Sequence, residues 1–193
     1  MAKIWYVWFR NTRSGTSTSL TTLITWVMNI NRFRTEIKWG LIFSIVMMLW
    51  MVFERTMGWH DEKIELHPTY TNLFAIVAVI VYVLALRDKK AKDFGGEMTW
   101  IQGFVFGLLV SLVVAILTPL SQWITHTLIS PDYFENAINY GVEHGLTTAE
   151  EAEAHFNLQS YIMVSTIFAL ITGAVTSAVV SFFMTVVPRW FRK

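Results

Sequence analysis

Long stretches without charged side chains alternate with short polar segments along this chain. Two apolar runs, WGLIFSIVMMLWMVF and TNLFAIVAVIVYVLAL, are followed directly by Glu54 and Arg87. Two longer stretches, 98–131 and 155–188, contain no Asp, Glu, Lys or Arg. Charged side chains are costly in hydrocarbon, so apolar runs of about 20 residues indicate membrane-spanning helices. The pattern predicts four spans, at about 38–57, 70–86, 99–122 and 160–187.

The segment between the third and fourth spans, about 123–158, carries most of the acid in the second half of the chain. Ser130 and Pro131 suit the start of a helix. One side of that helix is apolar, with Tyr133, Phe134, Ala137, Ile138, Gly141 and Val142.

Gly145 is a favourable stop for this first helix of the insert. Thr148 and Glu151 then have the spacing of a capping box, which predicts a second helix. The predicted fold class is therefore all-α: an integral membrane four-helix bundle with an external helical hairpin between spans three and four.

The distribution of Lys and Arg predicts the orientation of the spans. Only Arg55 and Lys63 fall in the predicted outer segments. The termini and the 87–97 loop carry the others, and basic residues accumulate in cytoplasmic loops. We therefore expect both termini inside, in a multi-pass protein of a bacterial inner membrane. Residues 1–34 are interpreted as a cytoplasmic or interfacial extension, 35–187 as the membrane domain and 188–193 as a basic tail.

Composition removes several classes of chemistry. Only 15% of the 193 residues are charged, whereas soluble domains have about a quarter. There is no cysteine, which excludes disulfides, thiolate metal sites and cysteine nucleophiles. No basic pattern predicts nucleic-acid binding, and the sequence assigns no cofactor.

Small residues recur at four-residue steps in spans three and four, and this spacing lets helix backbones approach closely. The central packing candidates are Gly103, Gly107, Ser111, Gly173 and Ser177. Packing of the two spans within one chain is preferred, and a homodimer seam is the alternative.

All five histidines fall in the predicted outer region. His60 and His67 lie seven positions apart with carboxylates between them, a donor set that suits zinc. Pro68 argues against a regular helix there, and no HExxH signature is present. Solvated loop histidines are therefore the preferred interpretation, with no metal site assigned and a weak cation or pH response left open. Glu54 is expected to extend to the membrane interface.

Three polar residues, Gln102, Gln122 and His126, form a candidate polar path along span three. No Asp, Glu, Lys or Arg lies near a predicted midplane, where pumps and proton-coupled carriers usually place one. This lowers the case for a transporter without removing it.

The segments TEIKWGLIFSIVMMLW, GGEMTWIQGFVFGLLVS and ISPDYFENAINYGVEHGLTTAEEAEAHF resemble a bacterial, Bacteroidetes-type family of four-span membrane proteins, catalogued as domain of unknown function 4199. The resemblance covers about 35–187 and supports the topology. Its members often begin near the equivalent of MNINRFRTEIKWG, which implies that Met28 is the usual start. The resemblance supplies no activity and no site residue.

The functional hypothesis is a non-enzymatic structural or accessory envelope subunit whose outer hairpin docks a membrane or envelope partner. Phe134, Ile138 and Phe156 are the candidate docking residues. The alternative is a small carrier or channel for a neutral or lipid-like solute. An enzyme that uses the outer histidines and acids ranks last, because no spacing supports one.

Overall fold

The computed structural model describes residues 33–187 of the chain. The chain divides into two units, Met1–Thr35 and Glu36–Lys193, and the second is described below. Most of the expected extension, the proposed start at Met28 and the basic tail lie outside the described residues.

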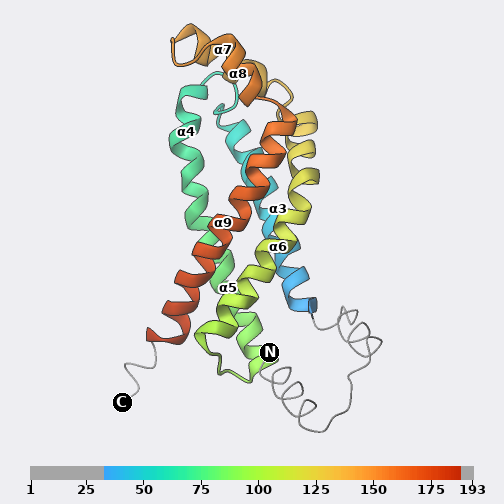
Figure 1. The fold of residues 1–193 in the computed structure, drawn as a ribbon, viewed down its shortest axis with the longest axis vertical. Helices are drawn as coiled ribbons and strands as arrows, with labels where there is room; N and C mark the ends of the chain where they lie inside the picture. Colours follow the sequence, from blue (N-terminus) through green and yellow to red (C-terminus); the bar gives the residue numbers. More distant parts are fainter. Residues whose placement is uncertain (1–32, 188–193) are drawn as a thin grey trace, which may run out of the picture. The chain divides into compact units, whose positions relative to one another are not determined.

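Four long helices form the framework: α3 (Arg34–Thr56), α5 (Phe74–Phe94), α6 (Trp100–Ile124) and α9 (Leu158–Thr185) (Figure 1). With adjoining short helical turns they give four segments long and apolar enough to cross a membrane. The described residues contain no strand. The chain is therefore an all-α, multi-pass membrane protein, as the hydrophobic pattern predicted.

Local sequence explains where these helices begin and end. Helix α5 ends at Phe94, and the next residue, Gly95, closes the helix with a left-handed φ of 58° that glycine adopts without steric cost. Helix α6 begins with a capping box in which Thr99 and Gln102 bond each other's backbone amides. Asn157 caps the start of α9 through a bond from the Ser160 amide. Helix α5 extends beyond the predicted edge of its span, because polar residues can continue a helix outside hydrocarbon.

Helices α6 and α9 make the most extensive helix–helix contact among the described residues. Gly107 faces Ser177, and Gly173 faces Ser111, so closely that a Cβ atom at either glycine would clash with the serine. Gly103 faces Ser181 in the same way. All five predicted packing residues therefore lie on this seam, within one chain.

Helix α3 is joined to α5 mainly through long side chains. Lys89 pairs with Glu36 at 2.8 Å, and Lys38 pairs with Asp88 at 2.8 Å. Phe43 packs edge-on against Tyr82 further along the helices, with ring centroids 5.7 Å apart. The Lys89–Glu36 pair is largely shielded, with side chains 10% and 5% exposed.

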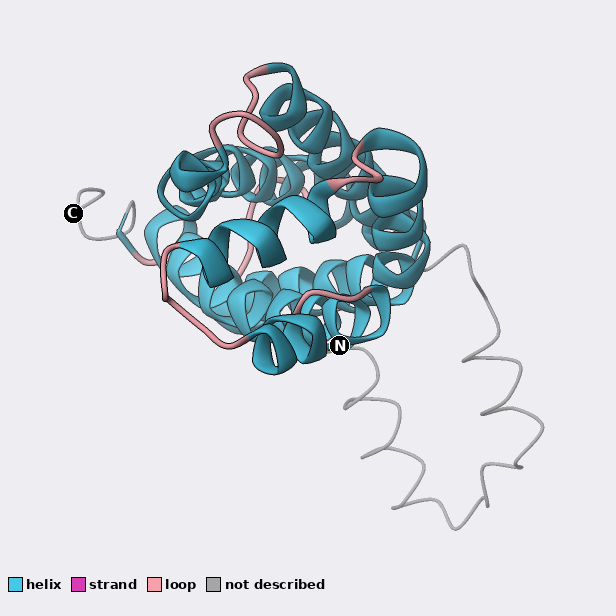
Figure 2. Ribbon diagram, turned by 90° about the horizontal axis from the view of Figure 1, so that it is seen from above, coloured by secondary structure: helices cyan, strands magenta, loops and turns pink. Residues whose placement is uncertain are grey.

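Two short helices, α7 (Tyr133–Glu143) and α8 (Ala149–His155), follow a π-helical turn, η4 (Thr125–Ile129), at the end of α6. They lie over one end of the long helices, here called the capped end (Figures 1 and 2). Gly145 has a φ of 64°, and the predicted Thr148–Glu151 capping box is confirmed. The Thr148 bonds lower the pKa of the Glu151 carboxyl.

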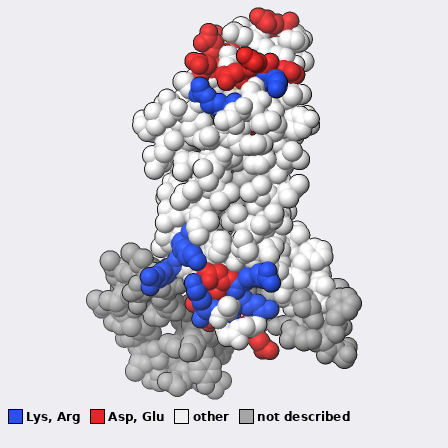
Figure 3. All heavy atoms as spheres, turned by 180° about the vertical axis from the view of Figure 1, so that it is seen from behind, with Lys and Arg blue, Asp and Glu red and all other residues white. Residues whose placement is uncertain are grey.

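Charged side chains gather at the two ends of the molecule (Figure 3). On the face shown, acidic side chains cluster at the capped end, and Lys and Arg predominate at the other end. The surface between them shows almost none of either charge. An uncharged belt of this kind suits a position across hydrocarbon.

Candidate metal centre

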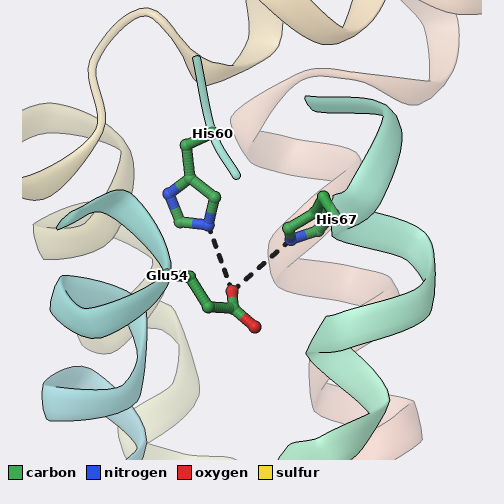
Figure 4. A group of neighbouring side chains, drawn as sticks. All are labelled: Glu54, His60 and His67. Carbon is green, nitrogen blue, oxygen red and sulfur yellow. Dashed lines mark hydrogen bonds and ion pairs between the residues drawn. The ribbon is translucent and has the colours of Figure 1, made fainter. Parts of the chain in front are cut away.

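Glu54, His60 and His67 converge at the capped end (Figure 4). The Glu54 Oε2 atom lies 3.1 Å from His60 Nε2 and 3.5 Å from His67 Nε2. The three donor atoms all lie within 4.8 Å of one another. Glu54 and His60 are buried, with side chains 0% and 3% exposed, and His67 is 19% exposed.

These distances suit a shared cation. With metal–ligand bonds of about 2.0–2.1 Å, two donors on a tetrahedral metal stand about 3.3 Å apart. The separations of 3.1 Å and 3.5 Å bracket that value. Two imidazoles and one carboxylate are also an established donor set for transition metals.

A compact turn brings His60 back over the end of α3. Gly58 has a φ of 79°, and the Trp59 amide donates to the Glu54 carbonyl at 3.1 Å. Trp59 is buried and stacks on Tyr70 with centroids 4.8 Å apart. His67 begins the short helix α4 (His67–Tyr70) beside it. The absence of a regular helix between the two histidines agrees with the sequence, but the turn still brings their rings together.

Each ligand side chain is held by a further group. The His60 Nδ1 atom lies 2.7 Å from Ser130 Oγ, and His67 Nδ1 lies 3.4 Å from the Tyr133 hydroxyl. The Trp50 indole donates to Glu54 Oε1 at 2.6 Å. Partners of this kind orient metal ligands and fix the imidazole tautomer.

Tyr133 lies among three histidines. Its ring centroid is 5.1 Å from His60, 5.2 Å from His67 and 5.4 Å from His126. Burial raises the pKa of the Tyr133 hydroxyl, and the nearby Tyr161 and Glu54 raise it further. The phenol is therefore neutral at physiological pH, and its oxygen can accept a hydrogen bond.

The candidate polar path is divided between the two ends of α6. Gln122 joins His126 at 3.1 Å and donates to Ser165 at 2.9 Å. Gln102 instead serves the capping box at the start of the helix. At about 1.5 Å per residue it lies roughly 30 Å from Gln122 along the axis. Gln122 and His126 are therefore paired at one end of α6 and Gln102 lies at the other, and a polar path along the helix stays a prediction.

The candidate docking residues have partners within the chain. Phe134 stacks on His126 at 4.1 Å and packs edge-on against Tyr161 at 5.0 Å. Phe156 packs on Tyr161 at 6.1 Å, and Ile138 is half-buried. Because Tyr133, Ala137 and Gly141 are buried, this face of α7 turns toward the bundle.

Three local expectations from the sequence are corrected. Glu54 does not extend to the membrane interface, because its carboxylate is buried between two imidazoles. His60 is not a solvated loop residue, with only 2% of its surface exposed. Ser130 does not cap α7, which begins after Asp132, because its hydroxyl faces His60.

The sequence contained one overlooked indication of the site. Glu54 is an acid at the end of a span, close in sequence to two histidines in one short connection. The zinc hypothesis from the sequence instead rests on the carboxylates between the two histidines. In the structure the carboxylate that meets the two imidazoles is Glu54, which precedes both histidines in the sequence.

Comparison with protein families places the chain. The family described as "Protein of unknown function (DUF4199)" matches residues 38–185. The chain belongs to this family. The DUF4199 match spans most of α3, all of α5, α6 and α9, and every residue of the candidate metal centre. Comparison with curated proteins and with solved structures gave no match.

Proposed function

We propose that this membrane protein binds one divalent transition-metal ion through Glu54, His60 and His67. The single observation that carries the proposal is the convergence of three donor atoms within 4.8 Å of one another. Imidazole nitrogens favour ions such as Zn²⁺, whereas Ca²⁺ and Mg²⁺ prefer sites made only of oxygen. The proposed ligand is therefore of the zinc class.

The groups around the three ligands support a binding role rather than catalysis. Structural zinc sites usually have four protein ligands and catalytic sites three with an open fourth position, so the three ligands found among the described residues do not by themselves separate the two roles. Zinc hydrolases also need a separate general base. The described groups that bond the ligands here include an indole and hydroxyls, none of which is basic at neutral pH. The proposed role is a non-enzymatic, metal-responsive accessory subunit of a bacterial envelope.

The proposed setting is the inner membrane, with both termini in the cytoplasm. The separation of acidic and basic side chains between the two ends supports this orientation. In this proposed orientation the metal centre lies on the outer side of the membrane. The proposed partners are the lipid bilayer and either a second envelope protein or another copy of the chain. A small carrier or channel for a neutral or lipid-like solute stays the alternative, and the convergence of Glu54, His60 and His67 favours the metal-binding role.

A metal titration of the purified protein tests the proposal. The protein, carrying a tag without histidine, is stripped with chelator in mild detergent and titrated with Zn²⁺. We expect one bound ion per chain. Because loss of an outer-shell partner alone costs about 10–100-fold in affinity, loss of a ligand should cost at least about 100-fold. Glu54→Gln, His60→Gln and His67→Gln are the variants to compare.

The chain also supplies matched controls for this titration. His144 and His155 are exposed and lie at the same end of the molecule. His144→Gln and His155→Gln should bind zinc as the wild type does. Wild-type protein without stoichiometric zinc, or ligand variants with unchanged affinity, would show that the three side chains form only a hydrogen-bonded cluster. Gel filtration establishes that each variant is folded.

A further inference from the structure

The insert between α6 and α9 contacts both histidines of the metal centre. We infer that Ser130 and Tyr133, which it contributes, are positioning residues of this centre, so that metal binding and docking of α7 on the bundle are thermodynamically linked. This inference rests on the proposed metal-binding function. The inference adds that the insert between α6 and α9 takes part in the metal site, and that its docking depends on whether metal is bound.

The two imidazoles have the same arrangement. Each directs Nε2 toward Glu54 Oε2 and places Nδ1 near a hydroxyl of the insert. A nitrogen that binds a metal must present a lone pair, so a neutral imidazole keeps its proton on the other nitrogen. The proton on Nδ1 would then be donated to Ser130 Oγ from His60 and to the Tyr133 hydroxyl from His67.

The local backbone brings these two hydroxyls to the site. Helix α6 widens into the η4 turn, which the Ser130 amide closes by donating to the Thr125 carbonyl at 2.7 Å. Wide turns of this type are frequent at functional sites. Ser130 is 3% exposed and Tyr133 is 5% exposed, so both are buried under the cap.

Helix α7 also contacts the backbone of the metal-binding loop. The Asn136 Nδ2 atom donates to the His60 carbonyl at 3.1 Å and to Asp61 Oδ1 at 3.2 Å. Displacing α7 would therefore remove the Nδ1 partner of His67 and loosen the loop that holds His60. It would also disturb the adjoining turn that holds Ser130 against His60. The docked helix and the ordered metal site support one another.

Linkage makes the effect reciprocal. If the docked cap raises metal affinity by a given factor, bound metal must favour the docked cap by the same factor. Loss of outer-shell partners typically weakens metal binding by about 10–100-fold. Zinc should therefore slow opening of α7 measurably, although none of the three ligands belongs to that helix.

The test combines zinc affinity with hydrogen exchange in the full-length protein. Tyr133→Phe keeps the ring and its packing but removes the hydroxyl, and Ser130→Ala removes the other acceptor. Each variant should bind zinc about 10–100-fold more weakly than the wild type. Tyr140→Phe is the control, since it removes a hydroxyl from the same helix away from the metal ligands. Ser130→Thr keeps a hydroxyl at this position and should therefore bind zinc more tightly than Ser130→Ala.

Hydrogen exchange of 133–143 with and without zinc gives the reciprocal measurement. Zinc should slow exchange in the wild type and Tyr140→Phe, but have no effect in Glu54→Gln. If the hydroxyls had only a structural role, their removal would change the exchange rate equally with and without zinc.

The linkage is wrong, and the binding function stands, if the wild-type protein binds zinc, both hydroxyl variants keep its affinity, and zinc does not change the exchange rate of α7. If wild-type protein binds no zinc, the function itself fails.

Discussion

Gly107 shows how one missing side chain sets the distance between two helices. A Cβ atom at this position would clash with the Ser177 side chain and would lie 3.3 Å from its Cα. Backbone cannot move aside as the end of a flexible side chain can. The close approach of α6 and α9 therefore depends on a glycine here.

The substitution Gly107→Ala should destabilise the protein by about 1–3 kcal/mol, the usual cost of overpacking a core. Alanine's better helix propensity, worth about 1 kcal/mol, offsets part of that cost. Unfolding in a denaturing detergent titration measures the net effect. Ala75→Val enlarges an exposed position on α5 and should change stability little. Equal stability of the two variants would contradict a tight seam at Gly107.

Individual contacts differed in how far the sequence could predict them. The glycines and serines of the seam could be predicted, because small residues at four-residue spacing are what lets two helix backbones approach closely. Glu54 could not be placed, because its burial depends on a turn at Gly58 that folds His60 back and on a helix start that presents His67. A charge at the end of a span has the same sequence pattern whether it faces water or a buried partner.

Helices α3 and α5 are joined near one end by a shielded ion pair. Lys89 contacts both Glu36 and Asp93, whereas Lys92 contacts Asp88 and is 59% exposed. Removing one partner of a buried pair leaves an uncompensated charge, whereas an exposed pair contributes little. The two lysines should therefore differ sharply in their importance.

Lys89→Met should destabilise the protein by about 3–5 kcal/mol, because it leaves the Glu36 carboxylate buried without its cation. Lys92→Met should cost at most about 1 kcal/mol. The double variant Glu36→Leu/Lys89→Met removes both charges and should recover much of the lost stability. Thermal unfolding in detergent compares the three, and a double variant as unstable as Lys89→Met would contradict this account.

The elements themselves were largely predictable, because long apolar runs have few alternatives to a spanning helix. The capping box at Thr148 was recognisable because both of its bonds depend on local spacing. The surface that the apolar face of α7 contacts could not be predicted, because the same apolar stripe could pack on the chain's own bundle or on another protein. Phe134 lies on His126 because the η4 turn and α7 fold together, a tertiary fact that helical periodicity does not contain.

The absence of native cysteine allows the proposed orientation to be tested directly. Ala154 in α8 and Ala91 in α5 are both exposed and lie at opposite ends of the helices. In spheroplasts, a membrane-impermeant maleimide should label Ala154→Cys at once and Ala91→Cys only after permeabilisation. The reverse pattern would place the metal centre on the cytoplasmic side and overturn the proposed orientation.

The three proposed metal ligands lie within residues 54–67, whereas Ser130 and Tyr133 follow two further complete spans. Domains generally fold from the N-terminal end during synthesis. A growing chain would therefore carry its full donor set before the groups that orient it have been made. Metal captured at that stage would be held weakly, and would be retained only once the insert between α6 and α9 had folded over it.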